Sequence, residues 1–129
     1  MAVITVDVTG PAPVETAWQR YLHPQNWTDW APHLTRVRAS TRTIRPGTTG
    51  TVTALGVVPA RFTVLSVDPD NFAWAWTVWV GPIRLDLHHD LVAGDNSTLA
   101  RIRLVGPRPV LLAYRPLMRW AMRRLVSDR

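Results

Sequence analysis

The fold of this chain is decided by residues 72–105, which have the sequence FAWAWTVWVGPIRLDLHHDLVAGDNSTLARIRLV. Between positions 83 and 91, every odd-numbered residue is Ile, Leu or His, and every even-numbered residue is Arg, Asp or His. Side chains that alternate in this way point to opposite faces of a strand, so one face is predicted to be buried and the other solvated. Gly81-Pro82 and residues 93–96 carry turn residues, which divide the stretch into strands over 72–80, 83–92 and 98–105.

Strand-like alternation extends toward the N-terminus. Further strands are predicted over residues 2–9, 34–43, 48–57 and 60–67, with turns at 45–47 and 68–71 and a junction near Val58-Pro59. Helical spacing and flanking prolines predict short helices over 14–22 and 25–30 and a terminal helix over 110–126. The fold class is therefore α+β, with an antiparallel sheet of about seven strands, and residues 1–129 are expected to form one domain.

The terminal helix is predicted to be amphipathic. Its apolar face is expected to cover the sheet and comprises Val110, Tyr114, Leu117, Met118, Ala121 and Leu125. Arginines lie on the opposite face, at positions 108, 115, 119 and 123. Pro116 predicts either a bend or a separate first turn, because proline removes one backbone hydrogen bond of a helix.

The composition is that of a globular protein, with 47% hydrophobic and 19% charged residues. All basic residues are Arg, a bias that points to a GC-rich, bacterial genome and weakens any inference from the net charge of +6 to nucleic acid. The absence of Cys excludes disulfides and thiolate metal sites and agrees with a reducing compartment. Residues 1–9 do not resemble a signal peptide, and no apolar run approaches the ~20 residues of a membrane span. A cytoplasmic protein with no transmembrane segment is expected.

Several short motifs, in a specific order along the chain, carry a resemblance to a known superfamily. They are PAPVETAW at 11–18, NWTDWAP at 26–32, PGT at 46–48, FAWAW at 72–76 and the hairpin from His89 to Thr98. Together they resemble the START-like superfamily, also called SRPBCC or Bet v 1-like, and in particular its bacterial polyketide cyclase/dehydrase and lipid-transport branch. Asn96-Ser97 departs from the Gly-Gly of that hairpin. The resemblance implies a helix-grip fold, in which the sheet wraps around the last helix, and a cavity between the two.

The first functional hypothesis is binding of a small hydrophobic molecule, such as a lipid, polyketide or isoprenoid. Seven tryptophans are many for 129 residues, and aromatic walls with few polar groups suit such ligands. The predicted ligand-binding residues are Trp30, Phe62, Trp74, Trp76, Leu87, His89, Tyr114 and Met118. The alternative is that the tryptophans simply fill the core. Trp79 has the opposite parity to Trp76 and is expected on the exposed rim.

The second hypothesis is an enzyme of the polyketide aromatase/cyclase type, with His89 as the candidate acid or base, assisted by Tyr114 or an arginine. His89 could equally be a polar anchor for a ligand or a buried histidine satisfied by a neighbour. The third hypothesis is an interaction domain for protein or RNA that uses the arginine face, although no specific nucleic acid partner is expected.

No cofactor or metal is predicted. The chain has no P-loop, GxSxG, HExxH or dinucleotide fingerprint. Asp86, His88 and Asp90 share a strand face at a spacing of ~6.6–6.8 Å, which is expected to be solvated and to include the competing Arg84. His23 and His33, near Asp29, are candidates for the cavity mouth, the alternative being capping or surface groups.

Overall fold

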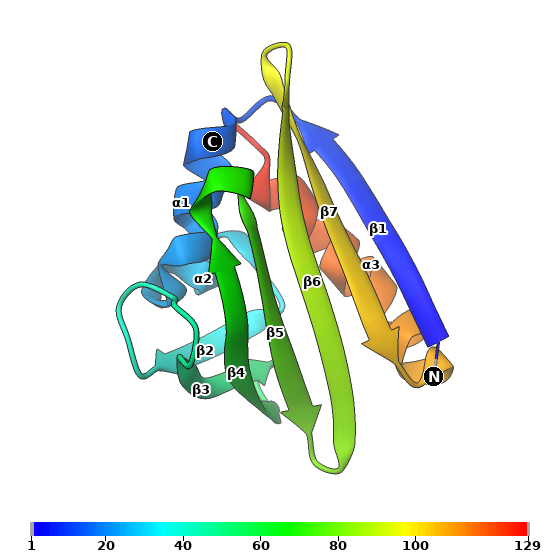
Figure 1. Ribbon diagram of the computed structural model, residues 1–129. Coiled ribbons are helices and arrows are strands. Elements are labelled where there is room, and N and C mark those ends of the chain that lie inside the picture. Colours follow the sequence, from blue (N-terminus) through cyan, green and yellow to red (C-terminus); the bar gives the residue numbers. More distant parts are fainter. Residues whose placement is uncertain (1, 129) are drawn as a thin grey trace.

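The computed structural model describes residues 2–128, and it forms one curved antiparallel sheet with three helices on its concave side (Figure 1). The elements are β1 (Ala2–Gly10), α1 (Val14–Leu22), α2 (Trp27–Trp30), β2 (Leu34–Ala39), β3 (Thr49–Ala54), β4 (Val58–Asp68), β5 (Ala73–Val80), β6 (Ile83–Gly94), β7 (Ser97–Gly106) and α3 (Arg108–Leu125), with single 3₁₀ turns at Pro24–Asn26 and Pro69–Asn71. The strand order is β1-β7-β6-β5-β4-β3-β2.

The sheet buries one face, as the alternation predicts. Leu85, Leu87 and Leu91 of β6 are at most 4% exposed, whereas Arg84 and His88 lie on the solvated face. The buried face packs on α3, whose Leu111, Met122 and other apolar side chains close the core. The predicted α+β class and helix-grip arrangement are thus confirmed.

The predicted position of the connection between β3 and β4 is wrong. The turn lies at residues 55–57, where Leu55 and Gly56 have positive φ, and not at Val58-Pro59. Pro59 lies inside β4, opposite Thr53. A proline is tolerated there because β4 pairs with β5 only from Arg61 onward, so the missing N–H breaks no bond on that side. The predicted strand over 34–43 also ends earlier, at Ala39.

Phe72 was predicted to begin the strand over 72–80, and this is wrong, although its side chain does pack against the core. It ends the 3₁₀ turn before the strand, in the left-handed region with φ of 50°. Its half-buried ring packs edge-on against Trp18 of α1, with 5.8 Å between centroids. The strand therefore begins at Ala73.

Helix α3 continues through Pro116, so its first turn is not a separate piece. Pro116 is exposed, and water can satisfy the backbone carbonyl that lacks its N–H. The buried stripe also includes Leu111 and Met122, which the predicted apolar face lacked, while Val110 and Tyr114 are only half-buried.

Gly50 allows three strands to approach one another closely. A Cβ atom at this position would collide with the carbonyl oxygen of Arg38 on β2 and would lie 2.7 Å from the Phe62 ring on β4. We expect Gly50→Ala to lower the free energy of unfolding by roughly 1–3 kcal/mol, measured by urea denaturation, because a strand or ring must shift. Thr51→Ala, at an exposed position of the same strand, is the control, and an equal effect of both would contradict the steric explanation.

Candidate ligand-binding cavity

A cavity of about 400 Å³ lies between the sheet and α3. This volume is within the range of small-molecule sites. Its walls come from the helical side (Tyr21, Trp27, Trp30, Ala31, His33), from the sheet (Leu34, Val52, Ala54, Leu55, Val58, Ala60, Trp74, Trp76, Val78, Val80, Ile83, Leu85, Leu87, His89, Ile102) and from α3 (Val110, Ala113, Tyr114, Leu117, Met118).

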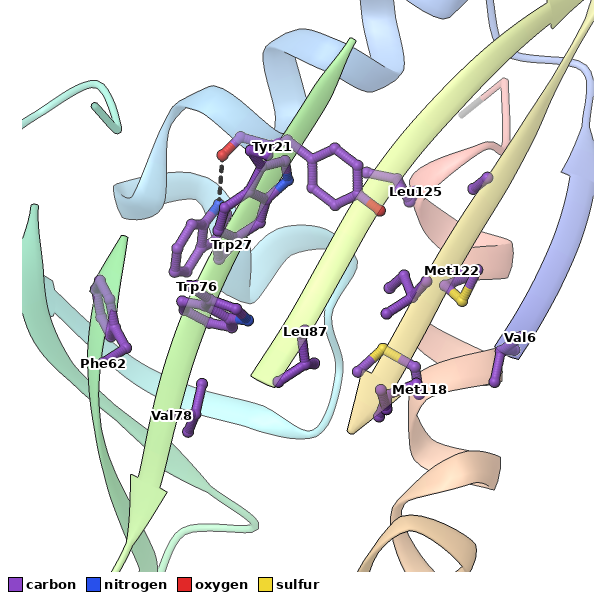
Figure 2. Close-up of a cluster of buried hydrophobic side chains, with 14 of the residues drawn as sticks. Val6, Tyr21, Trp27, Phe62, Trp76, Val78, Leu87, Met118, Met122 and Leu125 are labelled. Atoms are coloured by element: carbon purple, nitrogen blue, oxygen red, sulfur yellow. Dashed lines mark hydrogen bonds between the residues drawn. The ribbon is translucent and has the colours of Figure 1, made fainter. Parts of the chain in front are cut away.

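Seven of the eight residues predicted to bind ligand line this cavity. They are Trp30, Trp74, Trp76, Leu87, His89, Tyr114 and Met118. Phe62 does not line it. Its ring is buried against Trp76 at 4.9 Å and Trp27 at 5.7 Å, so it supports the wall from behind (Figure 2).

Three tryptophans from two elements form a cluster at the helical side of the cavity. The ring of Trp27 is stacked on Trp74 at 5.8 Å, and Trp76 lies 5.2 Å from Trp27 and 5.1 Å from Trp74. Trp27 is fixed by a hydrogen bond of 2.9 Å from its Nε1 to the carbonyl oxygen of Tyr21 (Figure 2). The cluster fills part of the core and leaves the cavity beside it. Trp79, on the outer face, is half-buried and takes no part.

Tyr21 and Trp27 were not among the predicted site residues. Tyr21 lies within the helix predicted over 14–22, and the NWTDWAP motif contains Trp27. Periodicity could not show that α1 and α2 fold over the end of the sheet, which is what brings both rings to the cavity wall.

His89 is an uncharged part of the wall. Its ring stacks on Trp74, with 4.0 Å between centroids and 5° between planes, and its Nδ1 lies 3.2 Å from the Trp74 carbonyl oxygen. Burial lowers the pKa of His89 to about 3, despite this hydrogen bond. At neutral pH the proton therefore resides on Nδ1, which donates to the carbonyl, and Nε2 is left as an acceptor.

A second buried histidine connects the loop after α2 to α3. Nε2 of His33 lies 3.0 Å from the hydroxyl oxygen of Tyr114, and both residues line the cavity. Burial lowers the pKa of His33 to about 4 and raises the pKa of Tyr114 to about 12. Both groups are uncharged near neutral pH. His23 lies outside this cavity, with its Nδ1 2.8 Å from the carbonyl oxygen of Gln19.

Four buried polar atoms of the cavity walls have no hydrogen-bond partner within residues 2–128. They are Tyr21 Oη, His33 Nδ1, Trp74 Nε1 and Trp76 Nε1. Each such group costs about 1–3 kcal/mol. Burial, with a smaller contribution from Asp90, raises the pKa of Tyr21 above its usual range, so this hydroxyl keeps its proton and is a donor. The indole nitrogens can only donate.

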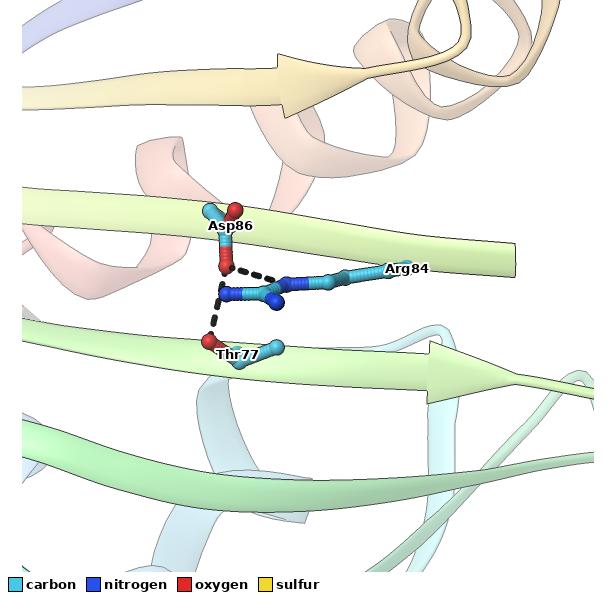
Figure 3. Close-up of polar contacts among 3 residues, drawn as sticks. All are labelled: Thr77, Arg84 and Asp86. Atoms are coloured by element: carbon cyan, nitrogen blue, oxygen red, sulfur yellow. Dashed lines mark hydrogen bonds and ion pairs between the residues drawn. The ribbon is translucent and has the colours of Figure 1, made fainter. Parts of the chain in front are cut away.

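Charged groups lie outside the cavity. Its walls contain no Arg, Asp or Glu among the residues that the structure describes. On the outer face of the sheet, Asp86 accepts hydrogen bonds of 2.7 Å from the Thr77 hydroxyl and 3.3 Å from Arg84 Nε (Figure 3). Within residues 2–128, no three His, Asp or Glu side chains are grouped so as to hold a metal ion.

Comparison with solved structures shows the fold clearly. Ara h 8.0201 superposes with a TM-score of 0.79 at 13% identity, over 96% of this chain and 94% of the other. Norcoclaurine synthase from Thalictrum flavum, solved in complex with dopamine and hydroxybenzaldehyde, gives 0.70 at 16% identity, over 96% and 84%. The di-domain ARO/CYC BexL from the BE-7585A biosynthetic pathway gives 0.80 at 13% identity, and this chain, matched over 98% of its length, covers 45% of BexL.

Sequence comparison identifies the family. No curated protein shows significant sequence similarity to the chain. The sequence profile described as "Polyketide cyclase / dehydrase and lipid transport" matches residues 1–128. Together with the Bet v 1-like neighbours, this match places the chain in the START-like, or SRPBCC, superfamily. The chain belongs to the polyketide cyclase/dehydrase and lipid transport family.

Proposed function

We propose that the protein binds a small, uncharged, mainly apolar molecule that carries hydrogen-bond acceptors, in the cavity between the sheet and α3. The observation that carries this proposal is a wall of apolar and aromatic side chains without charge, in which buried donors lack partners. The fold and family support the binding of a hydrophobic ligand in general. Lipids, polyketides and isoprenoids with oxygen substituents meet this description. We place the function in the cytoplasm, as the composition predicts.

The ligand is uncharged because the cavity offers no counter-charge. A carboxylate that leaves water for an apolar cavity loses its hydration, and the cost is large unless a cation compensates it. His33 and His89 do not supply that cation, since burial lowers their pKa values to about 4 and about 3. Fatty-acid anions are therefore expected to bind poorly.

The acceptors on the ligand follow from the partnerless donors. Trp74 Nε1, Trp76 Nε1 and Tyr21 Oη are buried donors without partners, and the side chains that carry them line the cavity. In Figure 2 the indole nitrogen of Trp76 lies on the side of the ring toward Leu87, another wall residue. A carbonyl or ether oxygen there would recover hydrogen bonds that the empty protein lacks. Apolar contact with Trp30, Tyr114 and Met118 would supply most of the affinity, and His89 Nε2 would orient a ligand hydroxyl.

A titration with matched ligands tests the proposal. We expect methyl dodecanoate to bind at least about tenfold more tightly than dodecanoate at pH 8, followed by tryptophan fluorescence and calorimetry. The two molecules differ mainly in charge. Equal or tighter binding of the carboxylate would show that the cavity does not select uncharged ligands.

A cavity-filling variant locates the binding site. Ala60 lines the cavity and is 7% exposed, so Ala60→Phe places a ring in the space that a ligand would occupy. We expect this variant to weaken methyl dodecanoate binding by about tenfold or more, with little loss of stability. Ala75→Phe, on the outer face of β5, is the matched control. Unchanged affinity of Ala60→Phe would place binding elsewhere.

An aromatase/cyclase-type reaction is the second candidate. The supporting observation is the hydrogen-bonded His33–Tyr114 pair on the cavity wall, together with the family description. His89 is a weak base at its lowered pKa of about 3, and its Nδ1 proton is engaged by Trp74. If the protein catalyses this reaction, a cyclisation assay with a poly-β-ketone should show turnover by the unmodified protein. Tyr114→Phe or His89→Gln should abolish that turnover. Full turnover by both variants would exclude these residues as its acid and base.

A further inference from the structure

The outer face of α3 is basic, with Asp29 and Asp128 beside its C-terminal end, where they share a surface hollow with Arg123 and Arg124. The helix carries five arginines over 18 residues and no acidic residue. Neither of the ion pairs found within residues 2–128 involves α3, and Arg108, Arg115 and Arg123 are exposed. Large apolar side chains accompany them, since Leu112 is 47% and Trp120 is 50% exposed.

The cavity opens beside this helix. Most of its wall residues are covered, but Leu55, Val58 and Ala113 are exposed, so the mouth lies between the β3–β4 hairpin and α3. The tip of that hairpin is apolar, with Val57 79% and Leu55 58% exposed. A flat surface that covers the mouth would therefore contact the apolar hairpin tip and the side of α3 that carries Ala113 and, two turns on, Trp120.

We propose that the outer face of α3 and the tip of the β3–β4 hairpin dock the protein on an anionic phospholipid surface, with the cavity mouth toward the membrane. Guanidinium groups form bidentate hydrogen bonds with phosphate, and tryptophan favours the boundary between headgroups and acyl chains. Leu112, Trp120 and Val57 provide the apolar contact, and the arginines provide the attraction to negative lipid.

The apolar side chains favour a membrane over a nucleic acid. A phosphate backbone in water is bound by cations and polar groups, and exposed Leu and Val contribute little to it. Docking would be peripheral, because no helix within residues 2–128 is long and apolar enough to cross a bilayer. A cavity that opens at the surface would allow an apolar ligand to pass between lipid and protein without crossing water. Membrane docking therefore extends the proposed function, but its own evidence does not depend on ligand binding.

Vesicle binding tests this surface on the whole protein. We expect co-sedimentation with vesicles of phosphatidylglycerol and phosphatidylcholine in equal parts, and little with phosphatidylcholine alone. The triple variant Arg115→Gln, Arg119→Gln, Arg123→Gln is expected to weaken binding by about a hundredfold. The control variant Arg36→Gln, Arg38→Gln, Arg61→Gln removes the same charge from exposed strand positions and is expected to retain binding. Trp120→Ala and Val57→Asp should each weaken binding in high salt, where apolar contact dominates.

Three outcomes of the vesicle experiment would overturn the proposal. Absence of binding to anionic vesicles contradicts it directly, and an equal loss in both triple variants would show only a general attraction by net charge. Polyuridylate that displaces the protein from vesicles at stoichiometric amounts would identify a nucleic-acid surface instead. Both triple variants should keep their thermal stability and their affinity for methyl dodecanoate. Ala60→Phe should keep its affinity for vesicles, so the cavity and the docking surface can fail separately.

Discussion

Acid is expected to destabilise the protein strongly, by on the order of 3 kcal/mol per buried histidine between pH 7 and pH 4. Burial lowers the pKa of His33 to about 4 and that of His89 to about 3, below the value of about 6.5 expected in the unfolded chain. As the pH falls below 6.5, the unfolded state takes up two protons that the folded state excludes. The stability present above pH 6.5 is therefore lost progressively toward pH 4.

Urea unfolding at closely spaced pH values measures this loss. Each histidine contributes a slope of roughly 1.4 kcal/mol per pH unit between pH 6 and pH 4.5. His33→Gln and His89→Gln should each reduce the total slope by one proton, because glutamine does not titrate. His88→Gln is the control, since that side chain is exposed on the outer face. A slope that neither buried substitution changes would show that these imidazoles are not excluded from protonation.

Removal of the Trp74 ring is expected to be the most destabilising single substitution in the cavity wall. The ring is 2% exposed and contacts four others, with centroid distances of 5.5 Å to Tyr21, 5.8 Å to Trp27, 5.1 Å to Trp76 and 4.0 Å to His89. Trp74→Ala is expected to cost about 3–5 kcal/mol, because apolar contact is lost and the existing cavity becomes larger. Thermal unfolding should shift down by roughly 10 °C or more.

Trp79 provides a matched control on the same strand. Its side chain lies on the outer face and is half-buried, so Trp79→Ala removes an equal ring from a wetter environment. We expect a clearly smaller loss of stability, compared by calorimetry under identical conditions. If the two substitutions had equal effects, the aromatic cluster would not be the centre of the core. If Trp74→Ala folded, its affinity for methyl dodecanoate would also be expected to fall.

Much of the cavity wall followed from parity along single strands. Trp74, Trp76, Leu87 and His89 occupy alternate positions of β5 and β6, and alternation alone places them on the buried face. The solvated face was equally predictable, with Asp86 beside Arg84. Phe62 shows the limit of this reasoning. It has inward parity, yet the rings of Trp27 and Trp76 stand between it and the cavity, and parity carries no information on depth.

The polar chemistry of the site depends on contacts between distant segments. His33 and Tyr114 are 81 residues apart in the sequence, and their hydrogen bond exists because the loop after α2 reaches α3. The lowered pKa of His89 follows from complete burial under Tyr21 and Trp74. The strand boundaries near Leu55 and Phe72 were predicted wrongly for a local reason. Leu55 and Phe72 adopt positive φ, which their residue types do not signal.

The sequence by itself determined the order of the elements, the two faces of the sheet, the basic and apolar sides of α3 and the superfamily, because these depend on local periodicity and short motifs. Only the tertiary structure decided that a cavity of about 400 Å³ lies beside the tryptophan cluster, which residues line it and which buried donors lack partners. Those properties depend on how closely α1, α2 and α3 approach the curved sheet. That distance results from the packing of side chains far apart in the chain, which no local pattern encodes.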